Sequence, residues 1–147
     1  MANVFDVARY ILNETGEVST MKLQKLCYYS FVKHMQDYGV KLFDGHFEAW
    51  ANGPVNRALF KVHKGLFVCN ERTFPAKLCN EKITREEQKS INYVLDKYGA
   101  LSGAELSEKT HGEAPWINAR GDMPTYLRCT KQIKLSDIES FYEANPI

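Results

Sequence analysis

The sequence predicts a mainly α-helical protein with a small antiparallel β-hairpin, folded as a single compact domain of about six helices. Apolar residues recur at steps of three and four along several stretches, which is the period of an amphipathic helix. Residues that cap helices precede these stretches, and glycines follow several of them. Between residues 40 and 51 apolar and polar residues alternate instead, which indicates a hairpin.

The longest helical stretch runs from Ser19 to Gly39. Ser19 or Thr20 can accept from the free N–H groups at its start, and Gly39 can adopt the left-handed conformation that ends it. The apolar stripe consists of Leu23, Leu26, Cys27, Ser30, Phe31, His34, Met35 and Tyr38. We expect this stripe to face the core.

The other side of the same helix carries Lys22, Lys25, Tyr29 and Lys33, again at steps of three and four. A cationic stripe with an embedded tyrosine is suited to docking an acidic partner. It is also typical of a solvated face whose lysines keep the protein in solution, and spacing alone favours that interpretation.

A shorter helix is expected over residues 3–13, with Asn3 as its cap and Gly16 as its end. Together with the helix from Ser19 it forms an antiparallel pair. Such a pair resembles the opening of a helix-turn-helix, so a DNA-binding function remains an alternative.

The hairpin is expected to have arms near 40–43 and 46–51, joined at Asp44-Gly45 and anchored by Trp50. Pro54 suits the first position of a helix over 54–64. Residues 66–69 are a short apolar run that can add a strand to the hairpin. Residues 70–82 are expected to be irregular.

The second half of the chain contains three capping boxes, in which a Ser or Thr and a Glu three residues later satisfy each other's free backbone groups. They begin at Thr84, Ser102 and Ser136 and predict helices over 84–98, 102–110 and 136–144. Pro115 begins another short helix that ends at Arg120. A further short strand is expected at 132–134.

Composition limits the class of protein. The chain has 147 residues and 44% apolar residues, so it can bury a core without disulfide bonds or a structural metal. Its net charge of +1 argues against binding DNA by neutralising many phosphates. Its four cysteines form no CxxC pair, which indicates reduced thiols. No stretch is long and apolar enough for a membrane span or signal peptide. We expect a cytoplasmic protein of one domain, residues 1–147.

No local signature of catalysis or of a cofactor site is present, and the four histidines are too scattered to indicate a metal site. His111, Glu113 and Arg120 form a polar cluster around Trp116 that can bind a partner. The structural interpretation, which we favour, places Trp116 in the core, His111 at a helix end and Glu113 near the start of the next helix. Catalysis by His111 with a thiol or carboxylate is a weaker hypothesis.

Several separated blocks resemble the Panacea domain, also called the SocA-like antitoxin domain. They are TMKLQKL at 20–26, YY at 28–29, LF at 42–43, FEAW at 47–50, GPV at 53–55, ELS at 105–107, TH at 110–111, PW at 115–116 and AR at 119–120. Cys27 and Ala51-Asn52 depart from the usual pattern, and residues 66–82 lie outside the matching blocks. The family-motif residues expected to be structural are Leu23, Leu26, Trp50, Gly53, Pro54, His111, Pro115, Trp116 and Arg120.

The resemblance implies a non-enzymatic antitoxin of a two-gene, phage- or mobile-element-associated toxin–antitoxin system that binds its cognate toxin directly. One branch of the family delivers its toxin to the ClpXP protease, so ClpXP is a second implied partner. No cofactor, metal or membrane is expected. Our candidates for partner binding are Lys22, Lys25, Tyr29 and Lys33, with Phe67 and Phe74 as a second patch. A DNA-binding regulator, including repression of its own operon, is the alternative.

Overall fold

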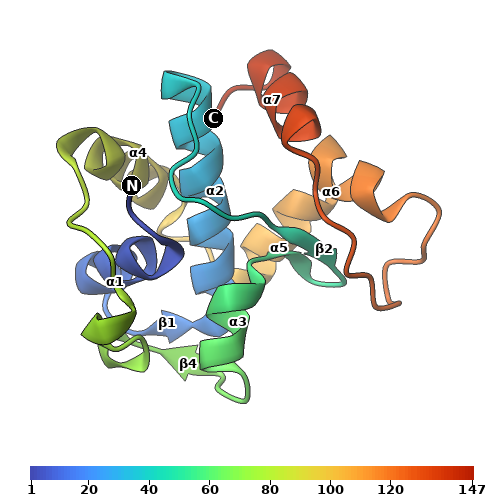
Figure 1. The fold of residues 1–147 in the computed structure, drawn as a ribbon. Coiled ribbons are helices and arrows are strands. Elements are labelled where there is room, and N and C mark those ends of the chain that lie inside the picture. The colour runs from blue at the N-terminus through green and yellow to red at the C-terminus, as the bar shows by residue number, and fades with distance from the viewer.

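A computed structural model describes all 147 residues, and in it helix α2 (Thr20–Tyr38) runs through the middle of the molecule (Figure 1). The other helices are α1 (Val4–Thr15), α3 (Arg57–His63), α4 (Arg85–Tyr98), α5 (Gly103–His111), α6 (Ala114–Arg120) and α7 (Leu135–Ala144). Figure 1 shows α1 and α4 on one side of α2, with α5 and α6 on the other. The expected fold class, a mainly helical domain with a minor sheet, is confirmed, with seven α-helices in place of about six.

Helix α2 is buried on all its faces through its central turns. Every residue from Leu23 to Val32 is buried, including Lys25 at 1% and Tyr29 at 0% exposure. The prediction of one buried and one exposed face is wrong, because α4, α5, α7 and the hairpin surround the helix. The motif residues Leu23 and Leu26 lie in the core as expected.

The predicted helix starts are mostly confirmed. Asn3 forms a capping box with Asp6, the Ser19 hydroxyl accepts from the Lys22 N–H at 3.1 Å, and the boxes at Thr84 and Ser102 both form. Gly39 has φ 69°, the left-handed conformation that ends α2. The third box is absent, because α7 begins at Leu135 with Lys134 at its cap and Ser136 already inside the helix.

The hairpin lies further along the chain than predicted. Strand β2 (Glu48–Trp50) pairs antiparallel with β3 (Gly53–Val55), and the turn is Ala51-Asn52 instead of Asp44-Gly45. The segment before it forms no strand, and its adjacent residues Leu42 and Phe43 are both fully buried. Pro54 consequently lies in β3, and α3 begins after Asn56, whose side chain caps it.

The remaining strands are short. Strand β4 (Val68–Cys69) pairs with β1 (Val18–Ser19) and not with the hairpin, contrary to the prediction. Between β4 and α4 the chain forms two 3-10 helices, η1 (Glu71–Thr73) and η2 (Ala76–Leu78). At the predicted 132–134 strand the structure has a single bridge, in which Gln132 pairs with Glu48. No helix of the protein combines the length and apolar character needed to cross a bilayer.

Candidate functional site

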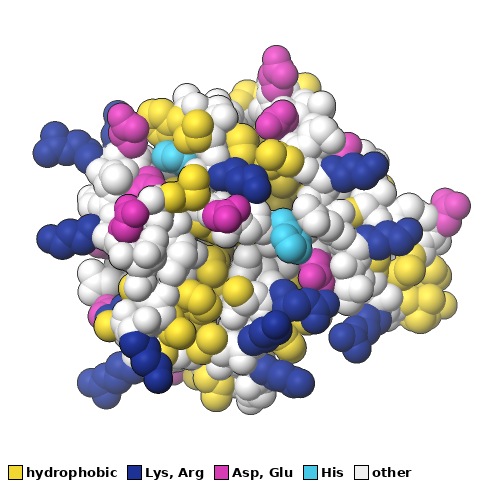
Figure 2. All heavy atoms as spheres, viewed as in Figure 1, with side chains coloured by type: hydrophobic (Ala, Val, Ile, Leu, Met, Phe, Trp, Pro, Cys, Tyr) yellow, Lys and Arg dark blue, Asp and Glu magenta, His cyan; other side chains and the backbone are white.

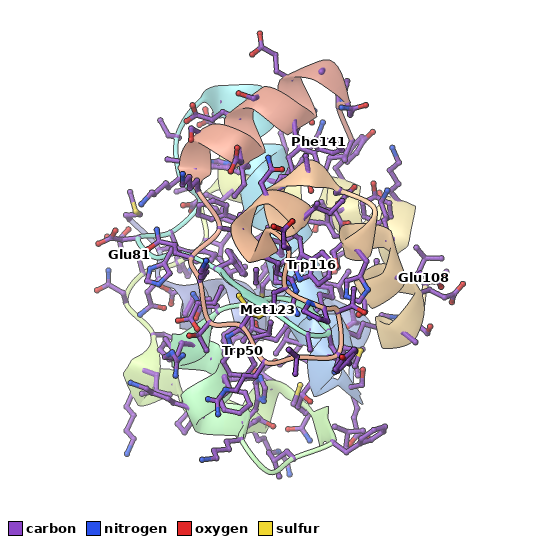
Figure 3. The ribbon with its side chains drawn as sticks, turned by 90° about the vertical axis from the view of Figure 1, so that its right-hand side faces the viewer. Trp50, Glu81, Glu108, Trp116, Met123 and Phe141 are labelled. Carbon is purple, nitrogen blue, oxygen red and sulfur yellow. The ribbon has the colours of Figure 1, made fainter.

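A pocket of about 390 Å³ opens between α2, the β2–β3 hairpin, α3 and the segment that follows α6. Its buried lining includes Gln24 and Lys25 of α2 and His63 of α3. Trp50 and Phe60 form an aromatic wall, with ring centroids 4.7 Å apart. In Figure 3 the segment after α6, where Met123 is labelled, passes beside Trp50. The pocket therefore joins four parts of the chain that are distant in sequence.

Lys25 is the most unusual group in this pocket. Its ammonium donates to the Pro54 carbonyl oxygen at 3.1 Å, and it belongs to none of the protein's ion pairs. Burial lowers the pKa of Lys25 from 10.5 to about 7, because a charge in an apolar surrounding loses its hydration.

Gly53 makes the position of Lys25 possible. Its φ is +112°, and a Cβ at this residue would lie 2.6 Å from Lys25 Cε and 2.7 Å from Thr110 Oγ1. Only glycine fits both the conformation and the space. The GPV block thus has a physical explanation: Gly53 leaves room for the lysine stem, and Pro54 supplies its hydrogen-bond acceptor.

Gln24 connects the pocket to the start of α3. Its side chain accepts from the Asn56 N–H at 2.9 Å and donates to the Asn56 carbonyl oxygen at 3.1 Å. The Gln24 amide nitrogen also lies 3.0 Å from His63 Nε2. Because an amide nitrogen only donates, His63 accepts there through its neutral form. Burial lowers the pKa of His63, and the nearby Lys25 lowers it further.

The polar residues around Trp116 stabilise the fold, as the structural interpretation predicted. The His111 and Trp116 rings stack at 4.1 Å, and the Trp116 indole donates to the Trp50 carbonyl oxygen at 2.8 Å. The Arg120 guanidinium is buried and donates to the Ala49 carbonyl oxygen at 2.9 Å. It also donates to the carbonyl oxygens of Pro124 and Leu127, each at 2.7 Å. These contacts fasten α6 and the following segment to the hairpin.

Glu113 is the centre of a buried hydroxyl network that sequence reasoning missed. Tyr29 and Tyr142 both donate to Glu113 Oε1, at 2.6 and 2.8 Å, and Lys109 lies 3.5 Å from Oε2. Burial raises the pKa of Tyr29 far above its usual range, and the Glu113 charge raises it further. Tyr29 therefore links α2 to α6 and is not accessible to a partner.

The predicted basic docking stripe does not form. Lys25 and Tyr29 are buried, Lys22 donates to the Gly99 carbonyl oxygen at 2.6 Å, and Lys33 pairs with Asp37 at 3.1 Å. The cause is that other helices and the hairpin surround α2, so Lys22, Lys25 and Tyr29 bond to groups distant in sequence, whereas Lys33 pairs one turn further along the same helix. The four candidate residues therefore do not form one exposed surface that a partner could contact.

The predicted second patch is also divided. Phe67 is 84% exposed, whereas Phe74 is fully buried and packs beside Phe5 with ring centroids 6.1 Å apart. The structure reveals another exposed aromatic residue that was missed, Tyr126, at 81% exposure. An isolated tyrosine in a polar stretch with Gly121 and Pro124 was the available signal. Among large apolar side chains, Phe67 and Tyr126 are the two most exposed.

No group of three or more His, Cys, Asp or Glu side chains is arranged to hold a metal ion. All four cysteines are free, and burial raises the pKa of Cys69 to about 11, which keeps that thiol protonated near neutral pH. Fold and site thus define a small helical protein whose buried polar groups connect its elements and whose most exposed large apolar side chains are the aromatic Phe67 and Tyr126.

The comparison with protein families identifies this class more closely. Residues 23–117 match the family described as Antitoxin SocA-like, Panacea domain, and the chain therefore belongs to this family. It is 27% identical over 116 residues to Antitoxin SocA of Caulobacter vibrioides (strain NA1000 / CB15N). That match covers 67% of this chain but only 58% of the relative. No solved structure matches. The family predicted from sequence is confirmed.

Proposed function

We propose that this chain is the antitoxin of a toxin–antitoxin pair and neutralises a cognate toxin by direct binding, in the cytoplasm and without catalysis. The observation that carries the proposal is the family match over residues 23–117, supported by the similarity to a protein named Antitoxin SocA. An antitoxin of this kind needs a stable scaffold and an exposed contact surface. The buried helix α2 and the exposed Phe67 and Tyr126 are consistent with both needs.

The direct test expresses the neighbouring gene alone and together with this chain. The neighbouring product alone should arrest growth, co-expression should restore growth, and the two purified proteins should elute together in size-exclusion chromatography. A neighbouring product that is harmless alone, or one that stays toxic and unbound beside this chain, would refute the proposal.

Delivery of the bound toxin to a protease is a finer form of the same proposal. If ClpXP acts with this chain, the half-life of the toxin should shorten when both are present and lengthen when the protease is removed. Neutralisation with an unchanged toxin half-life would indicate masking by contact alone.

The alternative function is DNA binding by a helix-turn-helix formed from α1 and α2, but α2 is not suited to be its recognition helix. A recognition helix must enter the major groove, whereas α2 is buried from Leu23 to Val32. We therefore do not propose DNA binding. A gel shift with the upstream region across a salt series tests this conclusion, since phosphate contacts weaken as salt rises.

A further inference from the structure

Lys25 is a buried cation without a counter-ion at the edge of the pocket. A lysine ammonium has three hydrogens to donate, and Lys25 makes one hydrogen bond, to the Pro54 carbonyl oxygen. An unpaired buried charge destabilises a fold, so most proteins avoid it. Here Gly53 nevertheless leaves the space that the lysine stem occupies. The arrangement would be balanced by an anion that enters the pocket.

The rest of the pocket also favours an anion. Arg128 lies at its exposed side and takes part in no ion pair, and no Asp or Glu is part of the lining. Figure 2 shows several Lys and Arg side chains over α3 and beside the hairpin, with hydrophobic atoms and one acidic side chain among them. A negatively charged group therefore meets attraction both on approach and at the binding position.

The surroundings of the pocket favour a polypeptide over a small molecule. Tyr126 lines the pocket, and the Phe67 carbonyl oxygen accepts from the N–H of Thr20, which also lines it. Tyr126 thus lies at the opening, and Phe67, the only large apolar side chain that is more exposed, belongs to the segment that pairs with Thr20 of the lining. A small anion that fills the pocket leaves them in water, whereas a protein surface covers them as aromatic anchors.

We propose that this pocket receives an acidic side chain of the toxin, whose carboxylate pairs with Lys25 and Arg128 while neighbouring apolar residues pack on Phe67 and Tyr126. This inference rests on the proposed function, because it names the contact by which the chain holds its partner. It assigns the binding surface to α2, the hairpin and the segment after α6, and not to the exposed turns of α4.

The test is calorimetric titration of the purified toxin with four forms of the full-length chain: wild type, Lys25→Met, Arg128→Ala and the control Lys89→Met. Lys25→Met should weaken binding about a hundredfold, because it removes the buried cation and leaves the partner carboxylate only the exposed Arg128 at the rim. Arg128→Ala, at the rim, should weaken binding about tenfold. Lys89 is exposed on α4 and makes the same change of charge away from the pocket, so its variant should bind within about twofold of wild type. Circular dichroism confirms that each variant is folded.

A second arm identifies the occupant. Arg128→Glu should lose binding, and changing the paired toxin Asp or Glu to Asn or Gln should weaken binding to wild type far more than binding to Lys25→Met. If wild type binds but Lys25→Met and Arg128→Ala bind equally well, or if no toxin carboxylate affects binding, this inference is wrong while the proposed function stands. If wild type itself does not bind the toxin, the proposed function fails.

Discussion

Replacing Lys25 by methionine should stabilise the protein, and by an amount that depends on pH. Methionine keeps most of the length and volume of the side chain but carries no charge to desolvate. In the wild type the folded state lowers the pKa of Lys25 from 10.5 to about 7. Between these values the unfolded chain binds more protons than the folded chain, so wild-type stability rises with pH. Below about pH 7 the penalty is fully present.

The size of the effect follows from the two pKa values. The difference of 10.5 − 7 = 3.5 units, at about 1.36 kcal/mol per unit, gives a penalty of about 5 kcal/mol at low pH. The same linkage gives about 4 kcal/mol at pH 7 and about 2 kcal/mol at pH 9. Losing the hydrogen bond to Pro54 costs the variant about 1 kcal/mol. We expect Lys25→Met to be more stable by about 3 kcal/mol at pH 7 and about 1 kcal/mol at pH 9.

Urea denaturation of both proteins at several pH values between 7 and 9 measures this difference. His63 and His111 lie near Lys25, but burial lowers the pKa of both, so they are neutral in the folded protein across this range. Taking the difference between variant and wild type removes the titration of all other groups. A variant that is less stable than wild type, or a difference that does not change with pH, would refute the reasoning about Lys25.

Three further predictions concern the contacts around the pocket and the core. Tyr29→Phe removes the hydroxyl that donates to Glu113 at 2.6 Å and should lower the free energy of unfolding by about 2 kcal/mol in urea denaturation; an unchanged midpoint would show that the bond contributes nothing. Gly53→Ala places a Cβ 2.6 Å from Lys25 Cε at φ +112° and should cost about 3 kcal/mol, seen as a lower Tm, whereas an unaltered Tm would contradict the strain. Arg120→Met removes the donors that hold the segment after α6 and should speed its cleavage in limited proteolysis severalfold, and equal cleavage rates would argue against that role.

Sequence was sufficient for features that depend on neighbouring residues. The caps at Asn3, Ser19, Thr84 and Ser102 form as predicted, because a capping hydrogen bond joins groups only two or three positions apart. The predicted position of the hairpin was wrong because Asp44-Gly45 is the stronger local turn signal, whereas the burial of Leu42 and Phe43 depends on core residues distant in sequence.

Sequence was insufficient where a polar side chain finds its partner far along the chain. The spacing and chemistry of Lys25 and Tyr29 predicted a solvated or docking face. Their partners, Pro54 and Glu113, are 29 and 84 residues away, so no local pattern could show that these two side chains are buried. Phe67 is exposed as expected, and its contact with a partner stays a prediction. Tyr126 and Arg128 joined the candidate site only once the fold placed their segment beside the hairpin.

The way Arg120 holds the segment after α6 has an evolutionary consequence. Its contacts to that segment end on main-chain oxygens, at Pro124 and Leu127 among others, and every amino acid carries such an oxygen. Substituting side chains there leaves the attachment intact. The residues displayed at this rim can therefore change without rebuilding the framework underneath, and under the proposed function such changes would alter which toxin is bound.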